Sequence, residues 1–210
     1  MLVGLCGAHR SGKTTLGTAF AAQHIEFKFV ATSVSDLMRS RGWNPAHDYP
    51  IEERLVMQDA ILDDLDRLYA SCEPFTVVDR TPLDAAAYLL ADVQRTNVSP
   101  ANQRKIVAYV NRAFQITNRR FGLIVFVPSV LPLVHAEGKA PAEEGYVEHI
   151  SILINGMKTD HRMKSRHFML RRGCIDLAAR VKAMDSCTKQ VFDQLGKEVD
   201  EVNASGFGAH

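Results

Sequence analysis

Short apolar runs alternate along this chain with longer segments in which apolar residues recur every three or four positions. The runs have the length and β-branched content of buried strands, and the longer segments have the periodicity of amphipathic helices. Strands are expected at 2–6, 27–31, 75–79, 123–127 and 167–170, and helices from about 13 and at 33–42, 51–69, 82–93, 101–120, 146–157 and 175–199. This alternation favours an α/β fold with a parallel, doubly wound, five-stranded sheet flanked by helices.

The loop after the first expected strand has the phosphate-binding pattern G-x-x-x-x-G-K-[ST]. Its glycines let the backbone fold around an anion, so that successive N–H groups point at the phosphates. The helix that follows adds its dipole, Lys13 is placed to reach the β- and γ-phosphates, and the Thr14 hydroxyl is placed to ligate Mg²⁺. We therefore predict a P-loop that binds ATP, with these residues as contacts: Gly7, His9, Arg10, Ser11, Gly12, Lys13, Thr14 and Thr15.

A second motif follows the third expected strand. A P-loop protein needs an acidic residue at the end of a neighbouring strand to hold the metal, and Asp79 is the candidate. Arg80 comes next, where an AAA-type ATPase has a glutamate that activates water. Because successive side chains of an extended chain point to opposite sides, Arg80 would face a second substrate, whose phosphate its guanidinium could bind. Lys13, Asp79 and Arg80 are thus the predicted catalytic group; the alternative is an Asp–Arg pair that only stabilises a turn.

The P-loop sequence Gly7–Thr15, taken with Asp79-Arg80-Thr81-Pro82-Leu83-Asp84, resembles the thymidylate-kinase-like branch of small P-loop kinases. More narrowly it resembles the bacteriophage 5-hydroxymethyluracil DNA kinases, and the similarity runs from residue 1 to about residue 195. The resemblance implies a nucleoside-kinase fold and a Mg·ATP-dependent phosphotransferase. It also implies an acceptor, the hydroxymethyl group of 5-hydroxymethyl-2′-deoxyuridine in phage DNA, as a step in thymidine hypermodification.

A hydroxyl acceptor needs a nearby carboxylate to take its proton, whereas a nucleoside monophosphate offers an ionised oxygen. Nucleoside kinases typically place that carboxylate directly after the second strand, but this chain has Ala31-Thr32-Ser33 there. Asp79 is therefore the first candidate for the base. Asp36 and Asp84 follow it, although each has the spacing of a helix-capping residue.

Basic residues at two places suggest further contacts. A helical lid insert is expected at about 128–166, and in an extended segment Arg162, Lys164 and Arg166 would share one side, as a phosphate clamp requires. The alternative is a solvated basic loop. A stripe of residues seven positions apart on one helix (Lys105, Arg112 and Arg119) is either a solvated surface or a track for a DNA backbone.

The composition suits one intracellular domain. The chain has 210 residues and a net charge of +1, which by itself indicates no acidic partner. We expect a single domain over 1–202 with a flexible tail at 203–210. Four cysteines without metal-ligand spacing, and a strand instead of a signal peptide at the start, predict a reduced cytoplasmic setting, the host cytoplasm if the protein is phage-encoded. No apolar run is long enough for a membrane span. The sequence does not determine the oligomeric state, and a homodimer is one alternative.

Other functions remain open at this point. The nearest alternatives are a deoxynucleoside monophosphate kinase and a nucleoside or ribosyl-nicotinamide kinase. A regulatory P-loop NTPase switch or AAA-type ATPase is the alternative from another class. The missing Asp-Glu pair argues against it, as does the absence of room for a C-terminal helical domain in a chain of 210 residues.

Overall fold

The computed structural model describes residues 1–44, 47–93, 98–132 and 143–206, without the side chains of 199–206. In this part of the chain, five parallel strands form one sheet in the order β2-β3-β1-β4-β5. The strands are β1 (Leu2–Cys6), β2 (Lys28–Val30), β3 (Thr76–Val78), β4 (Phe121–Phe126) and β5 (Arg166–Met169). The expected parallel, doubly wound sheet is therefore confirmed.

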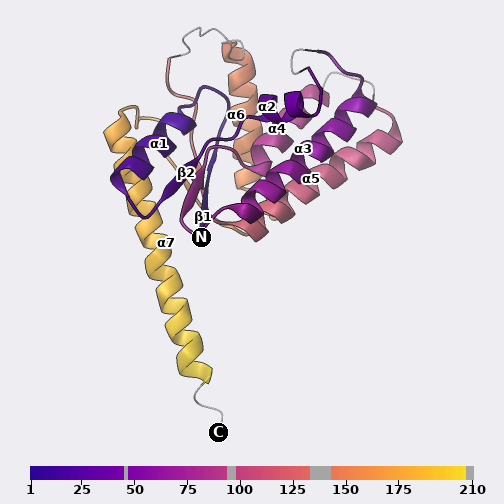
Figure 1. Cartoon of the computed structure of the whole chain (residues 1–210). Helices are drawn as coiled ribbons and strands as arrows, with labels where there is room; N and C mark the ends of the chain where they lie inside the picture. The colour runs from indigo at the N-terminus through magenta and orange to yellow at the C-terminus, as the bar shows by residue number, and fades with distance from the viewer. Residues whose placement is uncertain (45–46, 94–97, 133–142, 207–210) are drawn as a thin grey trace.

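Helices cover both faces of this sheet. They are α1 (Lys13–Gln23), α2 (Val34–Ser40), α3 (Ile51–Ser71), α4 (Pro82–Val93), α5 (Pro100–Arg120), α6 (Glu144–Lys158) and α7 (Leu177–Gly206). Helices α1 and α7 lie on one face, and α3 to α6 lie on the other (Figure 1). Along β1 the side chains alternate accordingly, since Val3 and Leu5 pack under α1 and α7 while Leu2 and Cys6 join the opposite core.

Differences from the expected boundaries fall mostly at the connections. Strand β4 begins at Phe121, directly after α5, because the last helical turn leads into the sheet without a loop. Helix α7 continues to Gly206, beyond the expected helix end at residue 199. Inside the predicted lid region, α6 packs on α4 and buries Val147, Ile150 and Ile154, so this helix is part of the main core. Residues 133–142 of that region, and 207–210 of the tail, lie outside the described residues.

The parallel sheet determines where a site can form. Because all strands run the same way, their carboxyl ends meet at one edge, where ligands bind in this architecture. The P-loop follows β1, Asp79 follows β3, and residues 127–132 and 170–176 follow β4 and β5. None of the helices in the described ranges has the length and hydrophobicity that crossing a bilayer requires.

Candidate active site

The phosphate-binding loop has a backbone shape that depends on its two glycines. Gly12 has a φ of +83°, a left-handed conformation that other residues adopt only with strain. At Gly7 an added Cβ would lie 2.4 Å from the carbonyl oxygen of Val127, so only glycine fits there. Helix α1 begins at Lys13, directly after the loop. The loop therefore places a helix N-terminus at the sheet edge, which is an arrangement that binds anions.

The side chain of Lys13 lies back across the loop. Its Nζ donates hydrogen bonds to the carbonyl oxygens of Gly7 at 2.6 Å and Ala8 at 2.8 Å. Burial lowers the pKa of this ammonium to about 8, although the carboxylate of Asp84, 3.9 Å away, acts in the opposite direction. Two neutral carbonyls compensate a buried charge only in part. An anionic phosphate would compensate it better, so Lys13 fits the predicted role in ATP binding.

The two predicted metal ligands are in contact. Thr14 Oγ1 donates a hydrogen bond to Asp79 Oδ2 at 2.5 Å, and the backbone N–H of Thr32 donates to Asp79 Oδ1 at 2.8 Å. Asp79 itself is buried. Magnesium is typically held by one or two protein oxygens together with phosphates and water. The pair of Thr14 and Asp79 therefore fits Mg²⁺ beside the loop.

Helix α4 supports the first half of the loop through two side chains that are one turn apart. Asp84 accepts hydrogen bonds from the N–H of Gly7 at 3.0 Å and from the N–H and Oγ1 of Thr81 at 2.8 and 2.7 Å. The Tyr88 hydroxyl accepts from the N–H of His9 at 2.9 Å. Asp84 is thus the expected cap of α4 and, in addition, a support of the loop. Because Asp84 is 1% exposed and bound on both oxygens, its alternative assignment as the base gains no support.

A cavity of about 310 Å³ opens beside the loop, between α2, α3, α4 and α6. Ligand pockets typically start at about 300 Å³, so the cavity has room for a nucleoside-sized molecule. The rings of Tyr49, Tyr88 and Tyr146 line it together with polar groups of Gln58 and Arg80. The Arg80 guanidinium lies 5.7 Å from the centre of the Tyr88 ring. Arg80 therefore faces a second concave site, as the alternation of side chains after β3 predicts.

The basic segment expected to clamp phosphates lies at the opposite edge of the sheet. Arg166 is the first residue of β5 and pairs with Leu123 in the first half of β4, whereas the P-loop follows the end of β1. Arg162 donates to both carboxylate oxygens of Asp160 and lies 4.5 Å from the centre of the Phe114 ring. The structure therefore contradicts the clamp predicted for Arg162, Lys164 and Arg166. The segment leads into the amino end of a parallel strand, so it cannot lie at the carboxyl edge.

Asp36 lies in the first turn of α2, where Ser33 is the N-cap. The Ser33 Oγ accepts a hydrogen bond from the N–H of Asp36 at 3.2 Å, which is half of the expected capping box. The carboxylate of Asp36 is exposed and pairs with Arg39 at 2.6 Å. It does not line the 310 Å³ cavity. The assignment of Asp36 as a base is therefore not supported by its position.

The basic stripe on α5 is largely neutralised by α3. Arg112 pairs with Asp59 and Asp63, and Arg119 pairs with Asp66 at 2.7 Å. The acidic face of α3 and the basic face of α5 thus form ion pairs with each other. Two of the three residues proposed to follow a DNA backbone are engaged within the protein.

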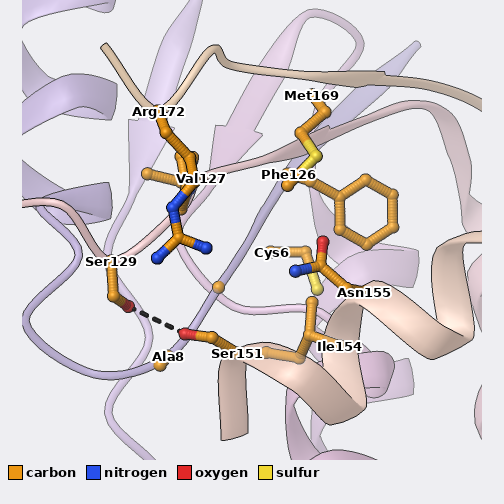
Figure 2. Close-up of a pocket in the computed structure, with 12 residues that line it drawn as sticks. Cys6, Ala8, Phe126, Val127, Ser129, Ser151, Ile154, Asn155, Met169 and Arg172 are labelled. Carbon is orange, nitrogen blue, oxygen red and sulfur yellow. Dashed lines mark hydrogen bonds between the residues drawn. The ribbon is translucent and has the colours of Figure 1, made fainter. Parts of the chain in front are cut away.

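A second and much smaller pocket lies on the other side of the loop, against β4 and α6 (Figure 2). It encloses about 10 Å³, roughly the space of one water molecule. The Ser151 hydroxyl donates to that of Ser129 at 3.1 Å, and Arg172 extends across the pocket toward them (Figure 2). Arg172 follows β5, so a basic residue does lie at the phosphate edge. It comes from a segment that the sequence analysis did not single out.

The structure also brings in Tyr88, Asp92 and Arg180, which the sequence analysis missed. Tyr88 and Asp92 follow Asp84 by four and eight positions, so the three share one face of α4. Polar residues at that spacing on an otherwise apolar helix are a signal that could have identified them. Burial raises the pKa of Asp92, which pairs with Arg54 at the cavity. Arg180 has no such signal, because it contacts the loop across 169 positions of sequence.

Comparisons with known proteins give matches at the level of structure alone. No protein-family model matches the sequence, and no curated protein matches it. The deoxyadenosine kinase from M. mycoides with bound dCTP is similar over 90% of this chain and 100% of its own, with a TM-score of 0.62 and 12% identity. Thymidylate kinase from Candida albicans is similar over 90% of this chain and 91% of its own, with a TM-score of 0.61 and 13% identity. The YorR protein from Bacillus subtilis, in complex with phosphorylated GDP, is similar over 90% of this chain and 96% of its own, with a TM-score of 0.54 and 11% identity. The chain therefore has the P-loop kinase fold.

Proposed function

We propose that this chain is a Mg·ATP-dependent kinase that phosphorylates a nucleoside-type or nucleotide-type acceptor. The observation that carries the proposal is that the phosphate loop and the 310 Å³ cavity are in direct contact through shared residues. His9 belongs to the loop and lines the cavity, and Tyr88 lines the cavity and binds the backbone of His9. Two adjacent sites can hold a phosphoryl donor and its acceptor next to each other in a reactive orientation. This positioning is most of what phosphoryl transfer requires.

Each predicted catalytic residue has a place in this arrangement. Lys13 and the loop N–H groups would hold the β- and γ-phosphates, and Thr14 and Asp79 would hold the metal. A bound Mg²⁺ supplies charge neutralisation on the phosphates. Arg80, on the cavity side of Asp79, is placed to bind phosphoryl or acceptor oxygens. For a hydroxyl acceptor, Asp79 remains the candidate base, because its carboxylate contacts Thr14 of the loop and the next residue, Arg80, lines the cavity.

The lining of the cavity favours a planar acceptor. Three tyrosine rings border it, and aromatic rings stack well on nucleobases. The similar structures support the same class, since their names concern deoxyadenosine, thymidylate and phosphorylated GDP. Within this class, the resemblance of the two motifs to phage kinases leads us to propose 5-hydroxymethyl-2′-deoxyuridine in DNA as the first acceptor to test. Such a base would have to leave its stack to enter the cavity.

A nucleoside monophosphate is the second candidate. Arg54 and Arg80 both line the cavity, and guanidinium groups bind phosphate oxygens well. The pairing of Arg112 and Arg119 with α3 also means that contacts to a DNA backbone would have to come from other residues.

The test is a transfer assay with ATP labelled at the γ-phosphate. The acceptors are hydroxymethyluracil-containing DNA, unmodified DNA, free nucleosides and free monophosphates, and Lys13→Met is the inactive control. Label on the modified DNA alone supports the first acceptor, and label on a free nucleoside or monophosphate moves the assignment within the class. Label that appears only as inorganic phosphate with every acceptor contradicts a kinase and favours a regulatory NTPase.

A further inference from the structure

A buried arginine lies behind the phosphate loop, on the last helix of the chain. Arg180 of α7 is 2% exposed, and its Nη2 donates a hydrogen bond to the carbonyl oxygen of Ser11 at 3.1 Å. Helix α7 packs against α1, which places this side chain under the loop. An added Cβ on Gly12 would come within 2.8 Å of Arg180 Nη1. The guanidinium thus touches the loop at the two residues that precede Lys13.

The charge of Arg180 has no counter-charge in the part of the chain that the structure describes. Among the described residues, no carboxylate lies within ion-pairing distance of it, and its Nε is buried without a hydrogen-bond partner. Burial lowers the pKa of this guanidinium. Two other partly buried arginines, Arg54 and Arg162, are paired with aspartates. Burial of an unpaired cation costs free energy, so stability of the ligand-free fold gives no reason for an arginine at position 180.

The peptide that Arg180 binds suggests the reason. The Ser11–Gly12 peptide is trans, so its C=O and N–H point to opposite sides. Arg180 binds the C=O side, and the N–H of Gly12 therefore points away from Arg180 and α7. A cation that donates to the carbonyl polarises the peptide and makes its N–H a stronger donor. The N–H groups of this part of a P-loop are the ones that bind phosphate.

We propose that Arg180 is a positioning residue for the nucleotide. It acts through the Ser11–Gly12 peptide, and the charge that it adds behind the loop is compensated by a bound polyphosphate. The inference rests on the proposed function only in requiring that the loop bind a nucleotide. It assigns α7, which contributes nothing to the predicted motifs, a role in nucleotide affinity.

The test measures binding and stability separately, without an acceptor. Arg180→Met and Arg180→Gln remove the charge, Arg180→Lys keeps it, and Lys182→Met removes an exposed charge from the same helix as a matched control. Calorimetry gives the dissociation constants for Mg·ATP and Mg·ADP, and thermal unfolding without nucleotide gives the melting temperature. Arg180→Met should weaken ATP binding about tenfold or more, and ADP binding by less, because one unscreened charge acts on fewer phosphate charges.

The readouts separate positioning from a structural role. The nucleotide-free melting temperature of Arg180→Met should equal or exceed that of the wild type, and Arg180→Lys should recover part of the ATP affinity. In the transfer assay, KM for ATP should rise while kcat at saturating ATP changes by less than about threefold. Lys182→Met should resemble the wild type in every measurement.

Three outcomes would overturn the inference. The first is an unchanged affinity for ATP in Arg180→Met, and the second is an equal loss for ATP and ADP with a lowered nucleotide-free melting temperature. The third is failure of both Arg180→Met and Arg180→Gln to fold, which would make Arg180 a structural residue. A wild type that binds no ATP contradicts the proposed function as well, whereas a wild type that binds ATP no better than Arg180→Met contradicts only the role of Arg180.

Discussion

The hydroxyl oxygen of Tyr88 accepts a hydrogen bond from the backbone N–H of His9 at 2.9 Å and lies 2.8 Å from the Nδ1 of the same residue. Tyr88 lines the 310 Å³ cavity, and His9 is part of the phosphate loop. One turn earlier on α4, Asp84 accepts from Gly7 in the same loop. Helix α4 therefore fixes the position of the loop relative to the cavity, and with it the distance between the two proposed substrates.

Tyr88→Phe should impair both substrates together. The ring and its packing stay, but the half-buried hydrogen bond between Tyr88 and the N–H of His9 is lost, and a hydrogen bond contributes roughly 0.5–1.5 kcal/mol. Because small misplacements of reacting groups are costly, kcat/KM should fall about tenfold or more whichever substrate is varied. Tyr146→Phe is the control, since it removes a hydroxyl from the same cavity lining. Equal and small effects of the two variants would show that the bond to His9 does not position the loop.

The main effect of Asp84→Asn should be a lower free energy of unfolding, because Asp84 supports the loop and is not assigned a step in the reaction. The carboxylate accepts three hydrogen bonds from Gly7 and Thr81 and lies near the buried Lys13 ammonium. An amide keeps one acceptor oxygen and places its NH₂ group against a donor, so the free energy of unfolding should fall by about 2–4 kcal/mol. Urea unfolding measures this loss. Asp36→Asn, at an exposed position in the first turn of α2, should change it by less than about 1 kcal/mol. A similar small value for Asp84→Asn would contradict the supporting role.

The fold could be predicted from the sequence because its signals are local. The strand before Gly7 and the bond from the Thr81 N–H to the Asp84 carboxylate, which is one half of the expected capping box, depend on neighbours within a few residues, and both are found. The misassigned clamp at Arg162, Lys164 and Arg166 shows the limit. Spacing predicts which side chains share a side, but the edge of the sheet at which they lie depends on the strand direction that follows.

Contacts between residues that are far apart in the sequence could not be predicted from local patterns either. Taken alone, the basic stripe of α5 is either a solvated surface or a track for a DNA backbone. Two of its arginines are neutralised by aspartates of α3 because the two helices pack side by side, and a local sequence pattern does not show this packing. Arg180 reaches Ser11 for the same reason, through the packing of α7 on α1.

Asp79→Asn should weaken the response to magnesium. Asp79 binds the Thr14 hydroxyl and the N–H of Thr32, so an asparagine can keep one of these bonds while losing the negative charge that a metal needs. We expect phosphoryl transfer to fall by about 10²-fold or more, with a higher magnesium concentration for half-maximal rate. The dependence of rate on magnesium is the measurement. A normal rate with normal magnesium dependence would reduce Asp79 to a residue that stabilises the turn.

Lys13 should make ATP binding dependent on pH. Burial lowers its pKa to about 8, so between about pH 8 and its ordinary value of 10.5 the folded chain binds fewer protons than the unfolded chain. The stability contribution of Lys13 therefore rises with pH across that window, and its penalty is fully present below about pH 8. Bound phosphate favours the charged ammonium, so ATP binding at about pH 8.5 should take up a proton, and affinity should weaken above about pH 8 by up to about tenfold per unit.

Calorimetry in two buffers with different ionisation enthalpies measures this proton uptake directly. Lys13→Met should show no uptake from this group, and its residual affinity should be independent of pH over the same range. An affinity of the wild type that is constant from about pH 7 to 9.5 would mean that Lys13 stays charged in the nucleotide-free loop.

Arg112→Gln combined with Arg119→Gln should affect stability and leave DNA binding alone. Arg112 pairs with Asp59 and Asp63, and Arg119 pairs with Asp66, so both charges are already compensated by α3. Exposed pairs contribute about 0.2–1 kcal/mol each, so the free energy of unfolding should fall by roughly 0.5–2 kcal/mol.

DNA binding should not change in the same variant. Each true phosphate contact makes DNA affinity more dependent on salt. Because we expect no such contact from these two arginines, the slope of log affinity against log salt should be the same in the variant and the wild type. Lys105→Gln, which removes the third charge of the stripe, serves as the control. A slope that becomes shallower by about one unit per arginine would show that these side chains leave α3 to hold a DNA backbone, and would restore the stripe as part of the acceptor site.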